Sequence, residues 1–162
     1  MNSAVHVMTN PAHARYLRRE TLIAAAINAG FSALAVFLVF GRRDPIEFWG
    51  AQGLALDFVP QTFIITLMTV TVATLLTRRR VRQGVIPALP RLQIRFPSNV
   101  LLRAMLLAAV ATVVLGGAAT ILLAAFRPSA FEFADVLVLK IAYGIIVAAV
   151  TAVLALRAAL GD

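Results

Sequence analysis

The sequence contains no cysteine, a single lysine and only seven acidic residues among 162 positions. Without cysteine, the chain cannot form a disulfide, use a thiol nucleophile or bind a metal through thiolate. The basic residues are therefore almost all arginine, and they give the chain a formal net charge of +8 at pH 7. Charged residues make up only 14% of the chain, which is well below the roughly 25% of a typical soluble domain.

Apolar residues fill most of the sequence instead. They make up 61% of the chain, and the mean hydropathy is +0.91, whereas soluble domains contain about 45–50% apolar residues. The apolar residues form four runs, each long enough to cross a hydrocarbon layer of about 30 Å as a helix. We therefore expect an all-α polytopic membrane protein with four transmembrane helices, at about residues 22–40, 54–77, 100–126 and 134–156.

The four spans are expected to form two helical hairpins. A basic segment precedes the first hairpin, and a basic linker containing proline separates the two. In chain order these parts are residues 1–20, the hairpin 21–77, the linker 78–99 and the hairpin 100–157.

Two short motifs predict where helices begin. Asp44 followed by Pro45 is typical of an N-cap and first helical residue, which predicts that the second helix begins near Pro45. Ser129 and Glu132 have the spacing of a capping box directly before the fourth span.

The two halves resemble each other. A shift of 84 places aligns Arg19 with Arg103, and a shift of 83 places aligns Asp57 with Lys140. Because both halves enter the membrane from the same side, we hypothesise a parallel internal repeat about an axis along the membrane normal. The alternative is chance similarity between alanine-rich helices.

The arginines are distributed unevenly between the two sides of the predicted membrane. Eleven of them lie on the side that carries both termini, and three lie on the other side. The positive-inside rule then predicts cytoplasmic N and C termini in a bacterial inner (plasma) membrane. Five of the seven acids lie at the opposite end.

Anionic lipid is the partner that this charge distribution favours, because arginines next to apolar spans meet lipid headgroups. Arg103, at the start of the third span, is expected to extend back to the same surface. We expect no nucleic-acid partner, since the basic residues do not lie on a soluble folded surface. The predicted lipid contacts are Arg78, Arg79, Arg80, Arg82, Arg91 and Arg95.

Small and weakly polar residues recur at helical spacing on the first and fourth spans. Such faces let helices approach closely in lipid and bond to one another. We expect them to hold helices together, within the chain, in a homo-oligomer or in a larger membrane complex. The predicted packing residues are Ala25, Asn28, Ala29, Ser32, Ala33, Gly144, Ala148 and Ala152.

Two charged residues within the spans are candidates for function, because charge inside a membrane is costly. One hypothesis is an ion pair between Asp57 and Lys140 that joins the two hairpins. A second places the polar face of the second span along a path for an ion or small solute. The third leaves Asp57 at the water boundary and lets Lys140 extend outward. The predicted path residues are Asp57, Gln61, Thr62, Thr66 and Thr69.

No catalytic, metal-binding or cofactor-binding motif is present in the sequence. His6 and His13 are seven residues apart without a neighbouring ligand, and we expect them in a solvated tail. The leading hypothesis is a non-catalytic helix-packing, accessory or scaffold component. A small oligomeric transporter or channel is the alternative, and a lipid-modifying enzyme is a weaker one.

Overall fold

Four long helices make up the chain in the computed structural model, which describes residues 11–41, 43–50, 53–88, 96–126 and 130–162. All four are long and apolar enough to cross a membrane. The predicted fold class, an all-α protein with four transmembrane helices, is confirmed. In order, the helices are α2 (Pro11–Phe40), α3 (Leu54–Arg82), the continuous α4 (Val100–Ala111), η1 (Thr112–Gly116) and α5 (Gly117–Ala125), and α6 (Phe133–Leu160).

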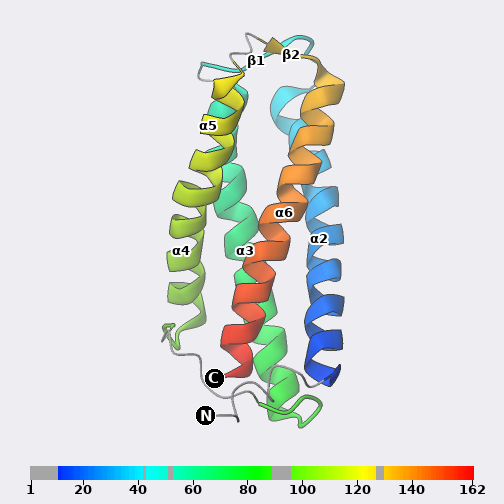
Figure 1. The fold of residues 1–162 in the computed structure, drawn as a ribbon, viewed down its shortest axis with the longest axis vertical. Helices are drawn as coiled ribbons and strands as arrows, with labels where there is room; N and C mark the ends of the chain where they lie inside the picture. Colours follow the sequence, from blue (N-terminus) through cyan, green and yellow to red (C-terminus); the bar gives the residue numbers. More distant parts are fainter. Residues whose placement is uncertain (1–10, 42, 51–52, 89–95, 127–129) are drawn as a thin grey trace.

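Successive helices run in opposite directions, as two hairpins require, but most packing occurs between the hairpins (Figure 1). α6 packs along both α2 and α3, and α3 also packs along α4. By contrast, the backbones of α2 and α3 rarely come close, and polar side chains bond across the space between them. Because each hairpin buries its faces against the other, neither hairpin is a separate packing unit.

A two-stranded ladder joins the two turns at one end of the molecule. β1 (Ile46–Glu47) pairs antiparallel with β2 (Ala130–Phe131). The prediction that the second helix begins near Pro45 is therefore wrong, because α3 begins at Leu54. The ladder satisfies backbone groups of this segment, and its Ile46 side chain is buried in the core. Of the predicted capping box, Glu132 precedes α6 without a side-chain cap and Ser129 lies outside the described residues.

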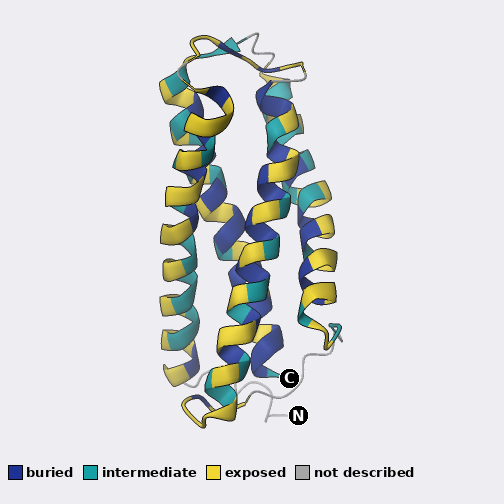
Figure 2. Ribbon diagram, turned by 180° about the vertical axis from the view of Figure 1, so that it is seen from behind, coloured by how far each residue is buried: buried dark blue, intermediate teal, exposed yellow. Residues whose placement is uncertain are grey.

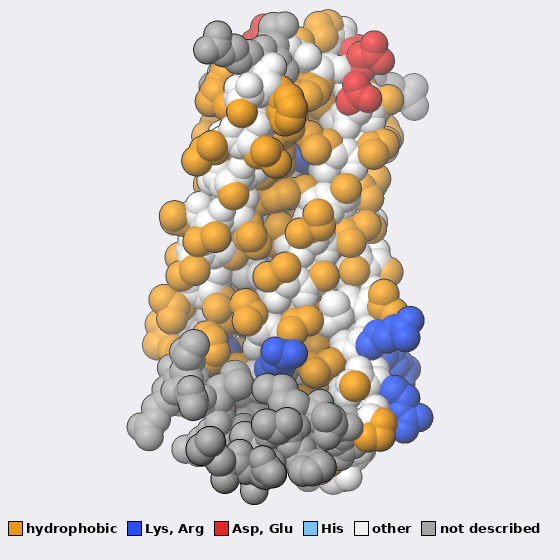
Figure 3. Space-filling view, viewed as in Figure 1, with side chains coloured by type: hydrophobic (Ala, Val, Ile, Leu, Met, Phe, Trp, Pro, Cys, Tyr) orange, Lys and Arg blue, Asp and Glu red, His pale blue; other side chains and the backbone are white. Residues whose placement is uncertain are grey.

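Two small clusters of buried apolar side chains lie along the bundle, and the largest cluster among the described residues lies at this same end. It combines aromatic and aliphatic side chains from α2, α3, α6 and the β1 turn, including Phe40, Phe48, Phe58 and Val136. The outward faces of the helices carry large exposed apolar side chains along most of their length (Figures 2 and 3). An apolar exterior of this kind is expected of helices surrounded by lipid.

Charge separates along the long axis (Figure 3). The acidic end carries the β1–β2 ladder, and the acids described there are Asp44, Glu47, Glu132 and Asp135. The basic end carries the start of α2, the end of α3, the start of α4 and the end of α6.

A candidate polar site between the membrane helices

An ion pair links the two hairpins one to two turns inside the acidic end. Lys140 Nζ lies 2.5 Å from Asp57 Oδ2, and the Lys140 side chain is 0% exposed. The ammonium group also lies 4.6 Å from the centroid of the Phe58 ring, where the electron-rich ring face attracts a cation. The structure therefore brings Asp57 and Lys140 together, and Lys140 does not extend outward to the surface.

Gln61 connects three helices from one position, a single turn along α3 from Asp57. Its Nε2 donates to Ser32 Oγ on α2 at 3.2 Å and to the Lys140 carbonyl oxygen on α6 at 3.3 Å. Hydrogen bonds between membrane helices contribute about 0.6 kcal/mol on average. The Gln61 amide thus reinforces the place where the ion pair joins α3 to α6.

Thr62 makes the next contact between α3 and α6. Its hydroxyl donates to the Phe58 carbonyl oxygen at 2.6 Å, so Tyr143 donates its own hydroxyl proton to Thr62 Oγ1. The neighbouring η1 segment leaves room for this pair, because a Cβ at Gly116 would lie 3.3 Å from Thr62 Oγ1. π-Helical turns of this type are frequent at functional sites.

Asn28 extends the polar contacts toward the basic end. Its Nδ2 donates to the Ala24 carbonyl oxygen at 2.8 Å and to Thr69 Oγ1 at 3.2 Å. We call the whole set of contacting side chains the polar seam. Its members are Asn28, Ser32, Asp57, Gln61, Thr62, Thr69, Lys140 and Tyr143.

Some polar atoms of α3 have no hydrogen-bond partner among the described residues. The buried atoms of α3 without such a partner are Thr66 Oγ1, Thr74 Oγ1 and Gln61 Oε1. Of the predicted path residues, Gln61, Thr62, Thr66 and Thr69 are thus all buried against other helices, and Thr66 alone makes no described side-chain hydrogen bond.

The predicted packing residues of α2 and α6 are all buried or half-buried, and two of them, Ser32 and Gly144, face each other closely. On α6, Gly144, Ala148 and Ala152 are buried. A Cβ at Gly144 would overlap the Ser32 hydroxyl and lie 3.1 Å from Ser32 Cβ. On α2, Asn28 and Ser32 are buried, and the flanking Ala25, Ala29 and Ala33 are half-buried.

A second polar cluster, at the basic end, was missed by the sequence reasoning. Arg103 is fully buried, and its two terminal nitrogens donate to the Asp162 carboxylate at 2.8 and 2.7 Å. Its Nε donates to the Pro97 carbonyl oxygen at 3.0 Å. Arg78 donates to Asp162 at 2.8 Å and to the Ser98 carbonyl oxygen at 2.7 Å.

The expectation that Arg103 extends to the membrane surface is therefore wrong. Its guanidinium is already hydrogen-bonded to the Asp162 carboxylate and to the Pro97 carbonyl oxygen. It therefore needs no lipid headgroup as a partner. One signal was present in the sequence: Asp162 and Glu20 are the only acids on the side that carries eleven arginines.

The same cluster shifts the titration of Asp162. Burial of this carboxyl raises its pKa, but the hydrogen bonds and positive charges of Arg103 and Arg78 outweigh that effect. The pKa of Asp162 consequently lies below the ordinary value for aspartate.

The start of α2 is attached to the end of α3 by a third group of contacts. Arg80 pairs with Glu20 at 2.6 Å and lies 5.4 Å from the centroid of the Tyr16 ring. The Tyr16 hydroxyl forms a hydrogen bond with Thr77 Oγ1 at 2.9 Å, in which either hydroxyl can be the donor. Two of the predicted lipid contacts, Arg78 and Arg80, thus have carboxylate partners within the chain.

The remaining predicted lipid contacts divide into two groups. Arg79 and Arg82 are exposed and have no ion pair with a described residue. Arg91 and Arg95 lie outside the described residues.

His13 does not lie in a solvated tail as expected. It is buried, and its Nε2 donates to the Pro87 carbonyl oxygen at 2.9 Å. The helix begins early enough, at Pro11, to carry His13 against the segment that follows α3. His6 lies outside the described residues.

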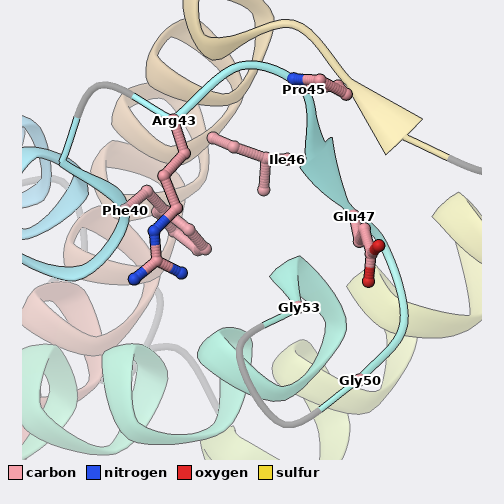
Figure 4. A pocket seen from close by; sticks show the side chains of 7 residues that line it. All are labelled: Phe40, Arg43, Pro45, Ile46, Glu47, Gly50 and Gly53. Carbon is pink, nitrogen blue, oxygen red and sulfur yellow. The ribbon is translucent and has the colours of Figure 1, made fainter.

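A cavity of about 320 Å³ lies beneath the β1 turn at the acidic end (Figure 4). Arg43 and Glu47 line it together with Phe40, Pro45, Ile46, Gly50 and Gly53. Within the described part of the chain, no group of three or more His, Asp or Glu side chains is placed to hold a metal ion.

Comparison of the chain with protein-family models, curated proteins and solved structures gave no match.

Proposed function

We propose that the chain is a non-catalytic component of a bacterial inner membrane, packing as a scaffold or accessory subunit with itself or within a larger complex. The polar seam is the observation that carries the proposal. The side chains of Gln61, Thr62 and Thr69 are engaged with α2 and α6, and Asp57 is engaged with Lys140. These side chains bond to one another within the chain, and mutual contacts of this kind favour a structural role for the seam.

The proposed orientation places the basic end in the cytoplasm. The described arginines at that end outnumber those at the acidic end, in keeping with the positive-inside rule. Arg79 and Arg82 are exposed there, and each exposed arginine near an anionic membrane surface adds about 1 kcal/mol of attraction. Anionic phospholipid is therefore the lipid partner that we propose.

Single cysteines test the orientation cleanly, because the chain contains none. Ser98 is exposed at the basic end and Glu132 is exposed at the acidic end. In intact cells, a membrane-impermeant maleimide is expected to label Glu132→Cys at once and Ser98→Cys only after the membrane is permeabilised. The reverse pattern would place the basic end outside and refute the orientation.

The scaffold role predicts association. The protein purified from its native membrane in mild detergent is expected to have a protein mass well above the 17.4 kDa of one chain, measured by light scattering with detergent subtracted. A protein mass of one chain in every mild detergent would contradict the role.

One observation favours a second candidate, a small oligomeric transporter or channel. One oxygen each of Gln61, Thr66 and Thr74 is buried in the bundle without a partner among the described residues, whereas buried polar atoms are usually satisfied by protein or water. Vesicles containing the purified protein test this candidate through the flux of protons or potassium. The scaffold role predicts the flux of protein-free vesicles, whereas transport predicts added flux that Thr66→Val and Gln61→Leu reduce. No comparable observation among the described residues favours a lipid-modifying enzyme.

A further inference from the structure

The arginines at the basic end fall into two groups according to their partners. Arg80 is paired with Glu20, and both Arg78 and Arg103 are paired with Asp162. Those two carboxylates are the only ones that the described chain has at this end. The exposed arginines of this end therefore have no described carboxylate to neutralise them, and they are Arg15, Arg18, Arg19, Arg79, Arg82 and Arg157.

Three of these exposed arginines form a compact group on α2, which we call the arginine triad: Arg15, Arg18 and Arg19. Residues three and four apart are neighbours on a helix surface, with Cβ atoms about 5–6 Å apart. Only the Nε of Arg15 has a described acceptor, the Pro11 carbonyl oxygen at 3.2 Å. The terminal nitrogens of all three arginines therefore lack described protein acceptors.

The triad faces away from the rest of the bundle. His13, Tyr16 and Glu20 form the α2 face that contacts the end of α3 and the segment after it. The triad alternates with them on the opposite side of the helix. Figure 3 shows basic side chains gathered at the outer edge of the molecule over this end of α2. The charge is therefore presented outward rather than toward another helix of the chain.

Exposed apolar surface begins directly beside the triad. Leu22 is 59% exposed and Ile23 is 42% exposed. Ala26 and Gly30 continue this outward face, and a Cβ added at Gly30 would meet nothing within 4 Å. The triad thus marks the level at which a lipid-covered helix surface gives way to headgroups.

We propose that the arginine triad binds the phosphate of an anionic phospholipid, with an acyl chain of that lipid lying along the exposed apolar face of α2. Guanidinium groups match phosphate oxygens in a bidentate geometry, and three of them on one helix provide charge complementarity at a single site. The proposal rests on the membrane placement proposed above. It goes further by separating one lipid site from the general positive charge of the basic end.

The test measures lipid binding to the full-length protein in detergent by native mass spectrometry, with phosphatidylglycerol as the anionic lipid and phosphatidylcholine as the zwitterionic one. The triad variant is Arg15→Gln/Arg18→Gln/Arg19→Gln. The matched control, Arg79→Gln/Arg82→Gln/Arg157→Gln, removes the same charge from exposed arginines of the same end. A third variant, Arg15→Lys/Arg18→Lys/Arg19→Lys, keeps the charge of the triad.

The wild type is expected to bind phosphatidylglycerol in preference to phosphatidylcholine. At about 1 kcal/mol for each arginine, the triad variant should bind the anionic lipid on the order of 100-fold more weakly. That attraction falls off with distance from the bound lipid, so the control, whose arginines lie on α3 and α6, should bind it at least about 10-fold more tightly than the triad variant does. The lysine variant should do the same because it keeps the charge of the triad. Both should have the helical content of the wild type by circular dichroism.

Two results would overturn the site. One is a triad variant that binds phosphatidylglycerol as tightly as the wild type, and the other is an equal loss in the control, which would show diffuse attraction without a defined site. Both of these results leave the proposed lipid partner intact. A wild type without preference for phosphatidylglycerol would instead refute that partner as well.

Discussion

At the scale of single residues, the buried Lys and Arg side chains of the described residues are each paired with a carboxylate from a distant part of the chain. Lys140 pairs with Asp57, and Arg103 pairs with Asp162. A buried charge that loses its partner is costly, because the remaining charge is removed from water without compensation. These residues should therefore be far more sensitive to substitution than the exposed arginines.

Replacing Arg103 tests this difference. Arg103→Gln removes the bidentate contact with Asp162 and the bond to the Pro97 carbonyl, and should lower the free energy of unfolding by about 3 kcal/mol or more. Arg79→Gln, at an exposed arginine without a described ion pair, should change it by no more than about 0.5 kcal/mol. Unfolding by a strong detergent, followed by circular dichroism, measures both. Equal effects of the two changes would contradict the pairing.

The pH dependence of stability should reveal the lowered pKa of Asp162. A carboxylate with a lowered folded pKa contributes stability above its unfolded pKa of about 3.9, and that stability is lost as pH falls through the folded value. The wild type should therefore lose stability more steeply below about pH 4 than Asp162→Asn, which is less stable at pH 7. Unfolding curves from pH 7 to pH 3 give the difference between the two proteins. A difference that does not shrink at low pH would refute the assignment.

The pairing of some buried charges could be predicted from the sequence and that of others could not, for a physical reason. Asp57 and Lys140 stand out because each is a charge inside an apolar run, and their pairing could be hypothesised from that alone. Arg103 stands at the edge of its run, where an arginine ordinarily extends to the headgroups. Its burial depends on the position of Asp162, which only the packing of α6 against α3 and α4 determines.

At the scale of elements, the close contact between α2 and α6 depends on one glycine of α6. Gly144→Ala would place a methyl group where the Ser32 hydroxyl lies and 3.1 Å from Ser32 Cβ. Ser32 must then rotate its hydroxyl away and α2 and α6 must move slightly apart, at a cost of about 1–3 kcal/mol. Gly30→Ala provides the control, since its Cβ would meet nothing within 4 Å. In a helix interior that change should be neutral or stabilising by up to about 1 kcal/mol. Detergent unfolding compares the two, and equal stability of both variants would contradict the α2–α6 contact.

The helices themselves could be predicted because lipid requires long apolar runs with every backbone group bonded within the run. The extended segment before α3 could not be predicted in this way. Asp44 and Pro45 resemble a helix start, yet the burial of Ile46 and Phe48 and the pairing of β1 with β2 favour an extended turn. Local capping signals were outweighed there by tertiary contacts between two loops that lie far apart in the sequence.

At the scale of the whole molecule, hydropathy did not predict which helices pack against each other. Helix α6 lies against both helices of the first hairpin. Lipid supplies no hydrophobic force to choose between neighbours, so small residues and polar contacts choose them. The polar seam then joins α2, α3 and α6 to one another, with the ion pair at its acidic end.

The most direct test of this account is a double-mutant cycle on the ion pair, using Asp57→Asn, Lys140→Met and the two changes together. We expect each single variant to lose several kcal/mol of unfolding free energy in detergent, because it leaves one charge between the helices without its partner. The double variant should then lose at least about 1 kcal/mol less than the sum of the two single losses. Strictly additive losses, or single variants as stable as the wild type, would contradict the claim that this pair joins the hairpins.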